Sequence, residues 1–114
     1  MTNYVDGKVI IVTGAASGFG KVLSLKAARL GGHIVCADIN GDTLQTAVEE
    51  IETAGGSAMA VQTDVTDADS MRSLVARGVA QYGQVDVLVN NAGIMPLAFF
   101  SDHEQASEAW NRCI

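Results

Sequence analysis

A glycine-rich segment at residues 13–20, TGAASGFG, lies between the apolar run VIIV and a helical pattern at residues 19–30. Backbone N–H groups in the first turn of a helix have no partners within the helix, and the helix dipole adds partial positive charge there. A strand, a glycine-rich turn and a helix in this order predict a site for a phosphate or pyrophosphate. The alternative is a turn that merely needs flexible residues, since glycine motifs have a real false-positive rate.

The three glycines of this segment have separate expected roles. Gly14 lets the chain leave the strand in a tight turn, Gly18 removes a Cβ where phosphates would approach, and Gly20 lets the helix pack close to the sheet. Their spacing is Gly-x-x-x-Gly-x-Gly rather than the standard Gly-x-Gly-x-x-Gly. A P-loop is excluded because that motif needs a glycine at position 15 and Ser or Thr at position 22, where this chain has Ala15 and Val22.

An acidic residue ends the second apolar run of the chain. Asp38 lies 24 residues after Gly14, and an acid about 20 residues past such glycines can accept hydrogen bonds from an adenosine ribose. Its charge would repel a 2′-phosphate, and no Lys or Arg stands at positions 15–17, 39 or 40 to neutralise one. We therefore predict NAD rather than NADP as the cofactor. The alternative is a solvated Asp in a turn.

Two further polar segments follow predicted strands. A short carboxylate at Asp64, followed by Val65, could hold an adenine amino group, or Asp64 could instead open the turn that caps the next helix. The segment NNAG at residues 90–93 offers Asn side chains, which carry a donor and an acceptor and can tie neighbouring strands or loops. Ala92 and Gly93 leave room for a ribose. The alternative is an Asn/Gly turn after a buried strand.

Alternating strand and helix patterns position these segments. We expect strands at residues 8–13, 33–38, 57–63 and 85–90, and helices at 19–30, at 42–54, after a cap at Thr66 or Asp67, and near residue 102. This order predicts an α/β fold with a doubly wound parallel sheet in the strand order 3-2-1-4. The ligand then lies at the carboxyl ends of the strands, where the order reverses. The first helix is expected to bury Phe19, Val22, Leu23, Ala27 and Leu30.

Composition limits the classes of partner and compartment. The chain has 114 residues, enough for one small domain, and no apolar run as long as the roughly 18 residues of a membrane span. A net charge of −6 argues against nucleic acid or an anionic membrane as the main partner. Cys36 and Cys113 are interpreted as reduced thiols of a cytoplasmic protein. No metal site is expected, because His33 and His103 are isolated from other ligands.

Together these segments resemble the classical short-chain dehydrogenase/reductase family. The matched parts are residues 13–20, Asp38, the pair 64–65 and the segment VDVLVNNAG at 85–93, and the likeness runs from about Gly7 to the last residue. Phe19 replaces a more usual aliphatic residue. The resemblance implies a Rossmann-type sheet and an NAD-dependent oxidoreductase, which transfers a hydride between the nicotinamide and an alcohol or carbonyl substrate.

The same resemblance assigns parts of the cofactor to residues of this chain. It implies that Asp38 holds the adenosine ribose and that Asp64 and Val65 hold the adenine. The other implied contacts are with the diphosphate and nearby ribose, at Gly14, Ser17, Phe19 and Gly20, and with the middle of the cofactor, at Asn91, Ala92 and Gly93.

The family's acid–base residues, a Ser and a Tyr-x-x-x-Lys on a helix, are not expected in this chain. Tyr4 and Lys8 have that spacing, but Gly7 disfavours a helix and Lys8 would lie at the amino edge of the sheet. We therefore predict an inactive N-terminal portion of a longer domain, from an enzyme that is a homo-oligomer at full length. The alternative is a non-enzymatic dinucleotide-binding module or pseudoenzyme.

Overall fold

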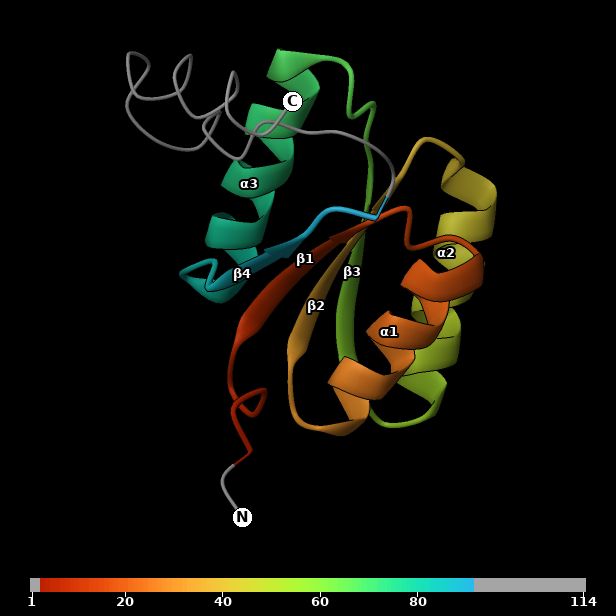
Figure 1. Cartoon of the computed structure of the whole chain (residues 1–114), viewed down its shortest axis with the longest axis vertical. Coiled ribbons are helices and arrows are strands. Elements are labelled where there is room, and N and C mark those ends of the chain that lie inside the picture. Colours follow the sequence, from red (N-terminus) through yellow and green to blue (C-terminus); the bar gives the residue numbers. More distant parts are fainter. Residues whose placement is uncertain (1–2, 92–114) are drawn as a thin grey trace.

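The computed structural model describes residues 3–91, which form an α/β unit with one parallel sheet (Figure 1). The four strands pair in the order β3-β2-β1-β4, and every pairing is parallel. This confirms the predicted doubly wound sheet and its strand order. In chain order the elements are β1 (Val9–Thr13), α1 (Gly18–Arg29), β2 (His33–Asp38), α2 (Gly41–Thr53), β3 (Ser57–Gln62), α3 (Ala68–Tyr82) and β4 (Val87–Val89).

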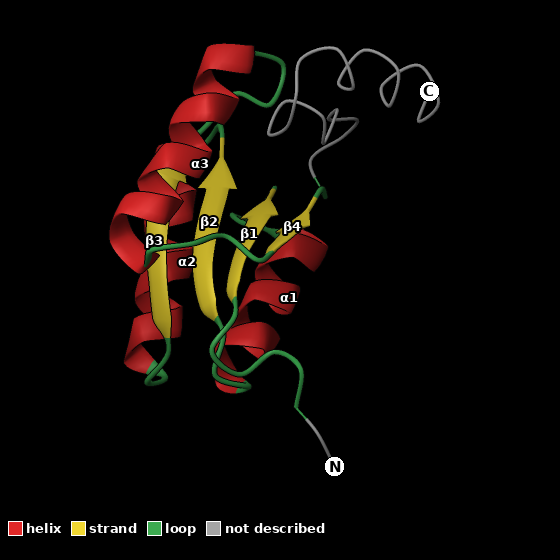
Figure 2. Cartoon of the chain, turned by 90° about the vertical axis from the view of Figure 1, so that its left-hand side faces the viewer, coloured by secondary structure: helices red, strands yellow, loops and turns green. Residues whose placement is uncertain are grey.

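Helices cover both faces of the sheet, with α1 and α2 on one face and α3 on the other (Figures 1 and 2). Successive side chains of a strand point to opposite faces, so β1 and β2 contribute to two core clusters. One cluster joins strand residues such as Ile10 and Ile34 to Leu44 and Ile51 of α2. The other joins Val9, Ile11, Val35 and Ala37 to Met71 and Leu74 of α3. Burial on both faces explains the nearly continuous apolar runs of the central strands.

The predicted buried face of the first helix is wrong at three of its five residues. Phe19, Val22 and Leu30 are 68%, 53% and 50% exposed. The residues of α1 that are buried are all small: Gly20, Ser24, Ala27 and Ala28. The helix lies close to the sheet, so its fully covered positions hold small side chains, while Leu25 packs against the same core cluster from a partly buried position. Apolar periodicity selected the larger side chains, but Leu23 is only half-buried, and of the predicted set only Ala27 is buried.

The ends of the other elements follow local hydrogen bonds. Asn40 caps α2 by accepting from the Thr43 N–H. Asp67 rather than Thr66 caps α3, because its carboxylate accepts from the N–H groups of Asp69 and Ser70. β4 is shorter than the predicted strand at 85–90. The helix predicted near residue 102, together with His103 and Cys113, lies outside the described residues. Within residues 3–91, no helix is both long and apolar enough to cross a bilayer.

Candidate cofactor site at the carboxyl edge of the sheet

The carboxyl ends of the parallel strands lie along one edge of the sheet (Figure 2). This edge brings together the glycine-rich loop after β1, Asp38 at the end of β2, Asp64 after β3, and Asn90 and Asn91 after β4. The four predicted segments therefore share one edge, as expected. Ala92 and Gly93 lie outside the described residues.

The glycine-rich loop delivers the chain to an uncapped helix N-terminus. Gly14 and Gly18 have φ angles of +67° and +60°, which favour glycine. Ser17 occupies the N-cap position of α1, but its side chain makes no capping hydrogen bond, and the first turn contains no acidic residue. Neither the N-cap side chain nor a residue of the first turn therefore offsets the partial positive charge at this end of α1. Such a terminus suits an anionic ligand.

Gly18 and Gly20 are required for different reasons. A Cβ at Gly18 would meet no atom of residues 3–91 within 4 Å, so its backbone conformation, rather than crowding, calls for glycine. The open space there agrees with the predicted approach of a ligand. A Cβ at Gly20 would overlap the carbonyl oxygen of Gly14 and lie 2.7 Å from Nδ2 of Asn91. Gly20 thus permits the close contact between α1 and the end of β1, as predicted.

The loop is tied to the end of β2 by two consecutive N–H groups. The Ala15 N–H donates to the carbonyl oxygen of Ala37 at 3.1 Å, and the Ala16 N–H donates to Oδ2 of Asp38 at 3.1 Å. The side chains of Ala15 and Ala16 are buried in the core cluster on the α1 side. The first part of the loop is therefore anchored to the protein by its own donors.

The carboxylate of Asp38 is held from two sides. Oδ2 accepts from the Ala16 N–H, and Oδ1 accepts from the Asn40 N–H at 3.1 Å. An ionised carboxylate has about four acceptor positions, so each oxygen retains capacity for a ligand hydroxyl. The two ion pairs among residues 3–91 are Lys21–Glu50 and Arg72–Asp69, and neither involves this carboxylate.

Gln62 was not among the predicted site residues. Its Nε2 donates to the carbonyl oxygen of Ile39 at 3.0 Å, and in the sheet register it lies beside Asp38. Gln62 therefore fixes the turn that follows Asp38. The sequence showed an amide side chain at the end of the third strand. Its hydrogen-bond partner, the Ile39 carbonyl, could be identified only from the register between β2 and β3.

Asp64 forms the turn that leads into α3. Its Oδ1 accepts from the Thr66 hydroxyl at 2.6 Å and from the Thr66 N–H at 2.9 Å. These bonds, the hydroxyl first, hold the pKa of Asp64 below its usual value, so the group remains a carboxylate. The structural alternative considered for Asp64 is thus observed, whereas its contact with adenine stays a prediction. Val65 is partly buried against the core cluster on the α3 side.

Thr13 links the end of β1 to the segment after β4. Its hydroxyl oxygen accepts from the Asn91 N–H at 3.0 Å and lies 3.3 Å from Oδ1 of Asn90, to which it donates. Nδ2 of Asn91 donates in turn to the carbonyl oxygen of Gly14 at 3.4 Å. The prediction that the Asn pair ties neighbouring segments is confirmed. The partner hydroxyl, a fully buried Thr at a strand end, was not predicted.

Other groups that could carry chemistry lie away from this edge or are unreactive. Residues 3–8 form no helix, and Tyr4 is 77% exposed, so the Tyr4–Lys8 spacing has no catalytic geometry. Burial raises the pKa of the Cys36 thiol to about 12, which makes it a poor nucleophile. Among residues 3–91, no group of His, Cys, Asp and Glu side chains could hold a metal ion.

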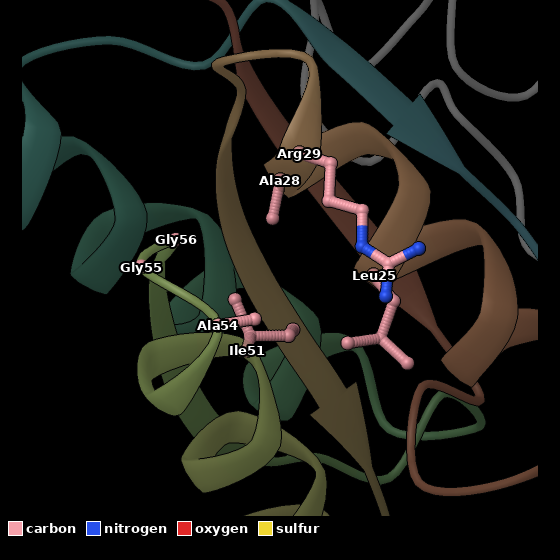
Figure 3. A pocket seen from close by; sticks show the side chains of 7 residues that line it. All are labelled: Leu25, Ala28, Arg29, Ile51, Ala54, Gly55 and Gly56. Atoms are coloured by element: carbon pink, nitrogen blue, oxygen red, sulfur yellow. The ribbon is translucent and has the colours of Figure 1, made fainter.

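A hollow of about 160 Å³ lies between α1 and α2, away from the glycine-rich loop (Figure 3). The Arg29 side chain extends along its α1 side, and Ile51 lies on its α2 side. Drug-sized ligands occupy cavities of roughly 300–1,000 Å³, so this hollow does not suit a dinucleotide.

Comparisons with known proteins agree with the fold. A model of the short chain dehydrogenase family matches residues 8–114. The chain is 37% identical to the 2,5-dichloro-2,5-cyclohexadiene-1,4-diol dehydrogenase LinX of Sphingobium indicum, over 100% of this chain and 45% of the relative. It is 40% identical to the 7alpha-hydroxysteroid dehydrogenase of Escherichia coli, over 78% of this chain and 35% of the relative. The chain thus spans less than half the length of these curated relatives.

Solved structures show the same likeness. A hydroxysteroid dehydrogenase from Escherichia coli superposes with a TM-score of 0.77 at 39% identity, over 81% of this chain and 39% of that chain. A short chain dehydrogenase/reductase from Burkholderia phymatum, solved in complex with NAD, gives a TM-score of 0.73 at 35% identity, over 77% of this chain and 31% of that chain. By its sheet order, its strand-end segments and these matches, the chain belongs to the short-chain dehydrogenase/reductase family.

Proposed function

We propose that this chain binds NAD at the carboxyl edge of its sheet and that the protein is an NAD-dependent oxidoreductase. One observation carries the proposal: the uncapped N-terminus of α1 lies next to a carboxylate, Asp38, that is hydrogen-bonded to the loop leading into the helix. The helix terminus favours a diphosphate, and the carboxylate favours ribose hydroxyls over a 2′-phosphate.

The remaining cofactor contacts are proposed by family likeness. The diphosphate and nearby ribose would contact Gly14, Ser17, Gly18, Phe19 and Gly20, the adenine would contact Asp64 and Val65, and Asn91 to Gly93 would contact the middle of NAD. When bound, NAD supplies hydride acceptance or donation. The residues of this chain bind and orient it, and Asp38 discriminates at the ribose.

The substrate proposed for the whole protein is a small alcohol or its carbonyl counterpart. The relatives include dehydrogenases named for a cyclohexadienediol and for a hydroxysteroid, and their shared chemistry is oxidation of a secondary alcohol. We propose residues 1–114 as one dinucleotide-binding portion of the domain, and a homo-oligomer as the assembled enzyme.

Calorimetric titration with NAD and NADP tests the cofactor proposal. We expect NAD to bind at least tenfold more tightly than NADP, a difference of about 1.4 kcal/mol. In the Asp38→Arg variant the preference should shift toward NADP, because the carboxylate is lost and a guanidinium can pair with the 2′-phosphate. A tenfold preference of the unaltered protein for NADP would overturn the assignment of Asp38.

A second candidate function is a dinucleotide-binding module without catalysis. Tyr4 and Lys8 have the catalytic spacing but lie outside any helix and before β1, so the described residues supply binding groups without a Tyr–Lys pair on a helix. The protein encoded by the complete reading frame separates the two functions. Reduction of NAD in the presence of a panel of secondary alcohols supports the enzyme, whereas tight NAD binding with no turnover supports the module.

A further inference from the structure

We propose that Asp38 is also a positioning residue for the glycine-rich loop, so that its side-chain oxygen strengthens the binding of diphosphates that lack an adenosine ribose. This inference rests on the proposed function, because it takes the loop as the diphosphate site. Asp38 would thus have two roles. It contacts the adenosine ribose directly, and it affects diphosphate binding indirectly by holding the glycine-rich loop in place.

The hydrogen bonds of the loop lead to this inference. Gly14 and Gly18 both have left-handed backbone conformations, and two hydrogen bonds tie the backbone between them to β2. The Ala15 N–H donates to the Ala37 carbonyl oxygen, and the Ala16 N–H donates to Asp38 Oδ2. The first bond joins two backbone groups. The second depends on a side chain, and it is the tie nearer to the N-terminus of α1.

The carboxylate is itself oriented for this task. Oδ1 accepts from the Asn40 N–H, and the turn that carries Asn40 is held by the bond from Gln62 Nε2 to Ile39 O. Asp38 is half-buried between the two segments. It therefore forms a bridge from the β2–α2 turn to the loop that presents the donors of α1. Preorganised donors bind an anion more tightly than mobile ones, because less ordering is needed on binding.

Charge and hydrogen bonding at Asp38 have opposite effects on an anion. Removal of the negative charge alone strengthens anion binding, since a nearby repulsion disappears. Removal of the accepting oxygen frees the Ala16 N–H and weakens binding. Asp38→Asn and Asp38→Ala are both uncharged, but only Asn keeps an oxygen that can accept from Ala16. The comparison of these two variants isolates the positioning role from the charge.

The experiment is a titration of the 114-residue chain with inorganic pyrophosphate, followed by NMR shifts of the loop amides. We expect the Asn variant to bind as tightly as the unaltered chain or more tightly. The Ala variant should bind about fivefold more weakly than the Asn variant, as for the loss of one ordinary hydrogen bond. The matched control is the pair Asp69→Asn and Asp69→Ala, because the Asp69 carboxylate is exposed, pairs with Arg72 and has no role in the proposed site. These two variants should bind pyrophosphate equally.

Amide hydrogen exchange in the unaltered chain gives a second measurement that needs no variant. The Ala16 N–H should be protected to a degree similar to that of Ala15, and in the Asn variant both should stay protected. In the Ala variant, exchange at Ala16 should rise at least fivefold while Ala15 is unchanged.

The outcomes separate the two levels of proposal. Equal pyrophosphate affinity of the Asn and Ala variants, or tighter binding by the Ala variant, overturns the positioning role while the NAD site stands. Rapid exchange at Ala16 beside a protected Ala15 in the unaltered chain does the same, even if the Ala variant does not fold. Absence of any pyrophosphate and NAD binding by the folded, unaltered chain removes both proposals.

Discussion

At Gly20 of the candidate site there is no space for a side chain. A methyl group there would overlap Gly14 O and approach the Asn91 amide. Both neighbours belong to the site, since Gly14 begins the loop and Asn91 joins it to the segment after β4. The contact is therefore a constraint on binding geometry as well as on packing.

We predict that Gly20→Ala weakens NAD binding at least tenfold and lowers the free energy of unfolding by about 1–3 kcal/mol, as for other overpacked positions. The added carbon must push α1 away from the loop. Calorimetric titration and urea unfolding measure the two effects.

The control is Gly55→Ala, at a glycine with φ of +88° and no atom of the described residues within 4 Å of its Cβ position. That variant should lose about 1–2 kcal/mol of stability through backbone strain alone and keep its affinity for NAD. Unchanged NAD affinity in Gly20→Ala would contradict the role given to this contact.

The packing of α1 on β2 depends on small and buried groups. Cys36 of β2 is fully buried on the α1 side of the sheet. Burial raises the pKa of its thiol to about 12, and a hydrogen bond with Ser24 of α1 opposes part of this rise. Ser24 also donates to the carbonyl oxygen of Gly20 at 2.7 Å. The contact between α1 and β2 therefore includes a thiol, that of Cys36, which stays protonated in the folded state.

This contact predicts a loss of stability at alkaline pH. The unfolded thiol ionises near 9.0 and the folded thiol near 12, so between these values the unfolded state has lost a proton that the folded state retains. The contribution of Cys36 is complete below pH 9, and above it the free energy of unfolding falls by about 1.4 kcal/mol per pH unit.

Urea unfolding at pH 8, 9 and 10 measures this slope, with Cys36→Ala as the reference for all other titrating groups. The variant is less stable at pH 8 because of the cavity, but its free energy of unfolding should fall less steeply with pH. Parallel slopes for the two proteins would show that Cys36 does not carry the effect.

Across the whole sheet, the site depends on contacts between segments far apart in the chain. Thr13 contacts Val89, Asn90 and Asn91, which are 76 to 78 residues away. β4 pairs with β1 over three residues, so these side-chain bonds extend a short pairing at the site edge. They join the two strands at which the sheet order reverses.

We predict that Thr13→Val destabilises the fold by about 1–2 kcal/mol, because the hydrogen bonds between its hydroxyl and the segment after β4 are lost. Amide exchange should accelerate at residues 87–89 and remain unchanged in β2 and β3, because the β2–β3 pairing does not involve Thr13. Thr13→Ser keeps the hydroxyl and should restore most of the protection in β4. If amide exchange accelerated equally in all four strands, β4 would not unfold independently of the rest of the sheet, and the prediction would be wrong.

Much of the architecture was predictable because its signals are local. Apolar runs that end in Gly14, Asp38 and Asp64 placed the strand ends, and right-handed crossovers then set the strand order. The face of α1 was not predictable in this way. Its distance from the sheet is set by Gly20 and the two alanines, and apolar periodicity gives larger side chains more weight than small ones.

The amino-acid sequence alone determined the order of strands and helices, the edge at which a ligand would lie, and the residue types that suit a dinucleotide there. Only the tertiary structure decided which groups share hydrogen bonds at that edge: Asp38 with Ala16, Gln62 with Ile39, and Thr13 with Asn91. The reason is that periodicity and turn chemistry act over a few residues. Hydrogen bonds between strand ends depend instead on strand register and on how closely α1 approaches the sheet, and both are set by the packing of the assembled core.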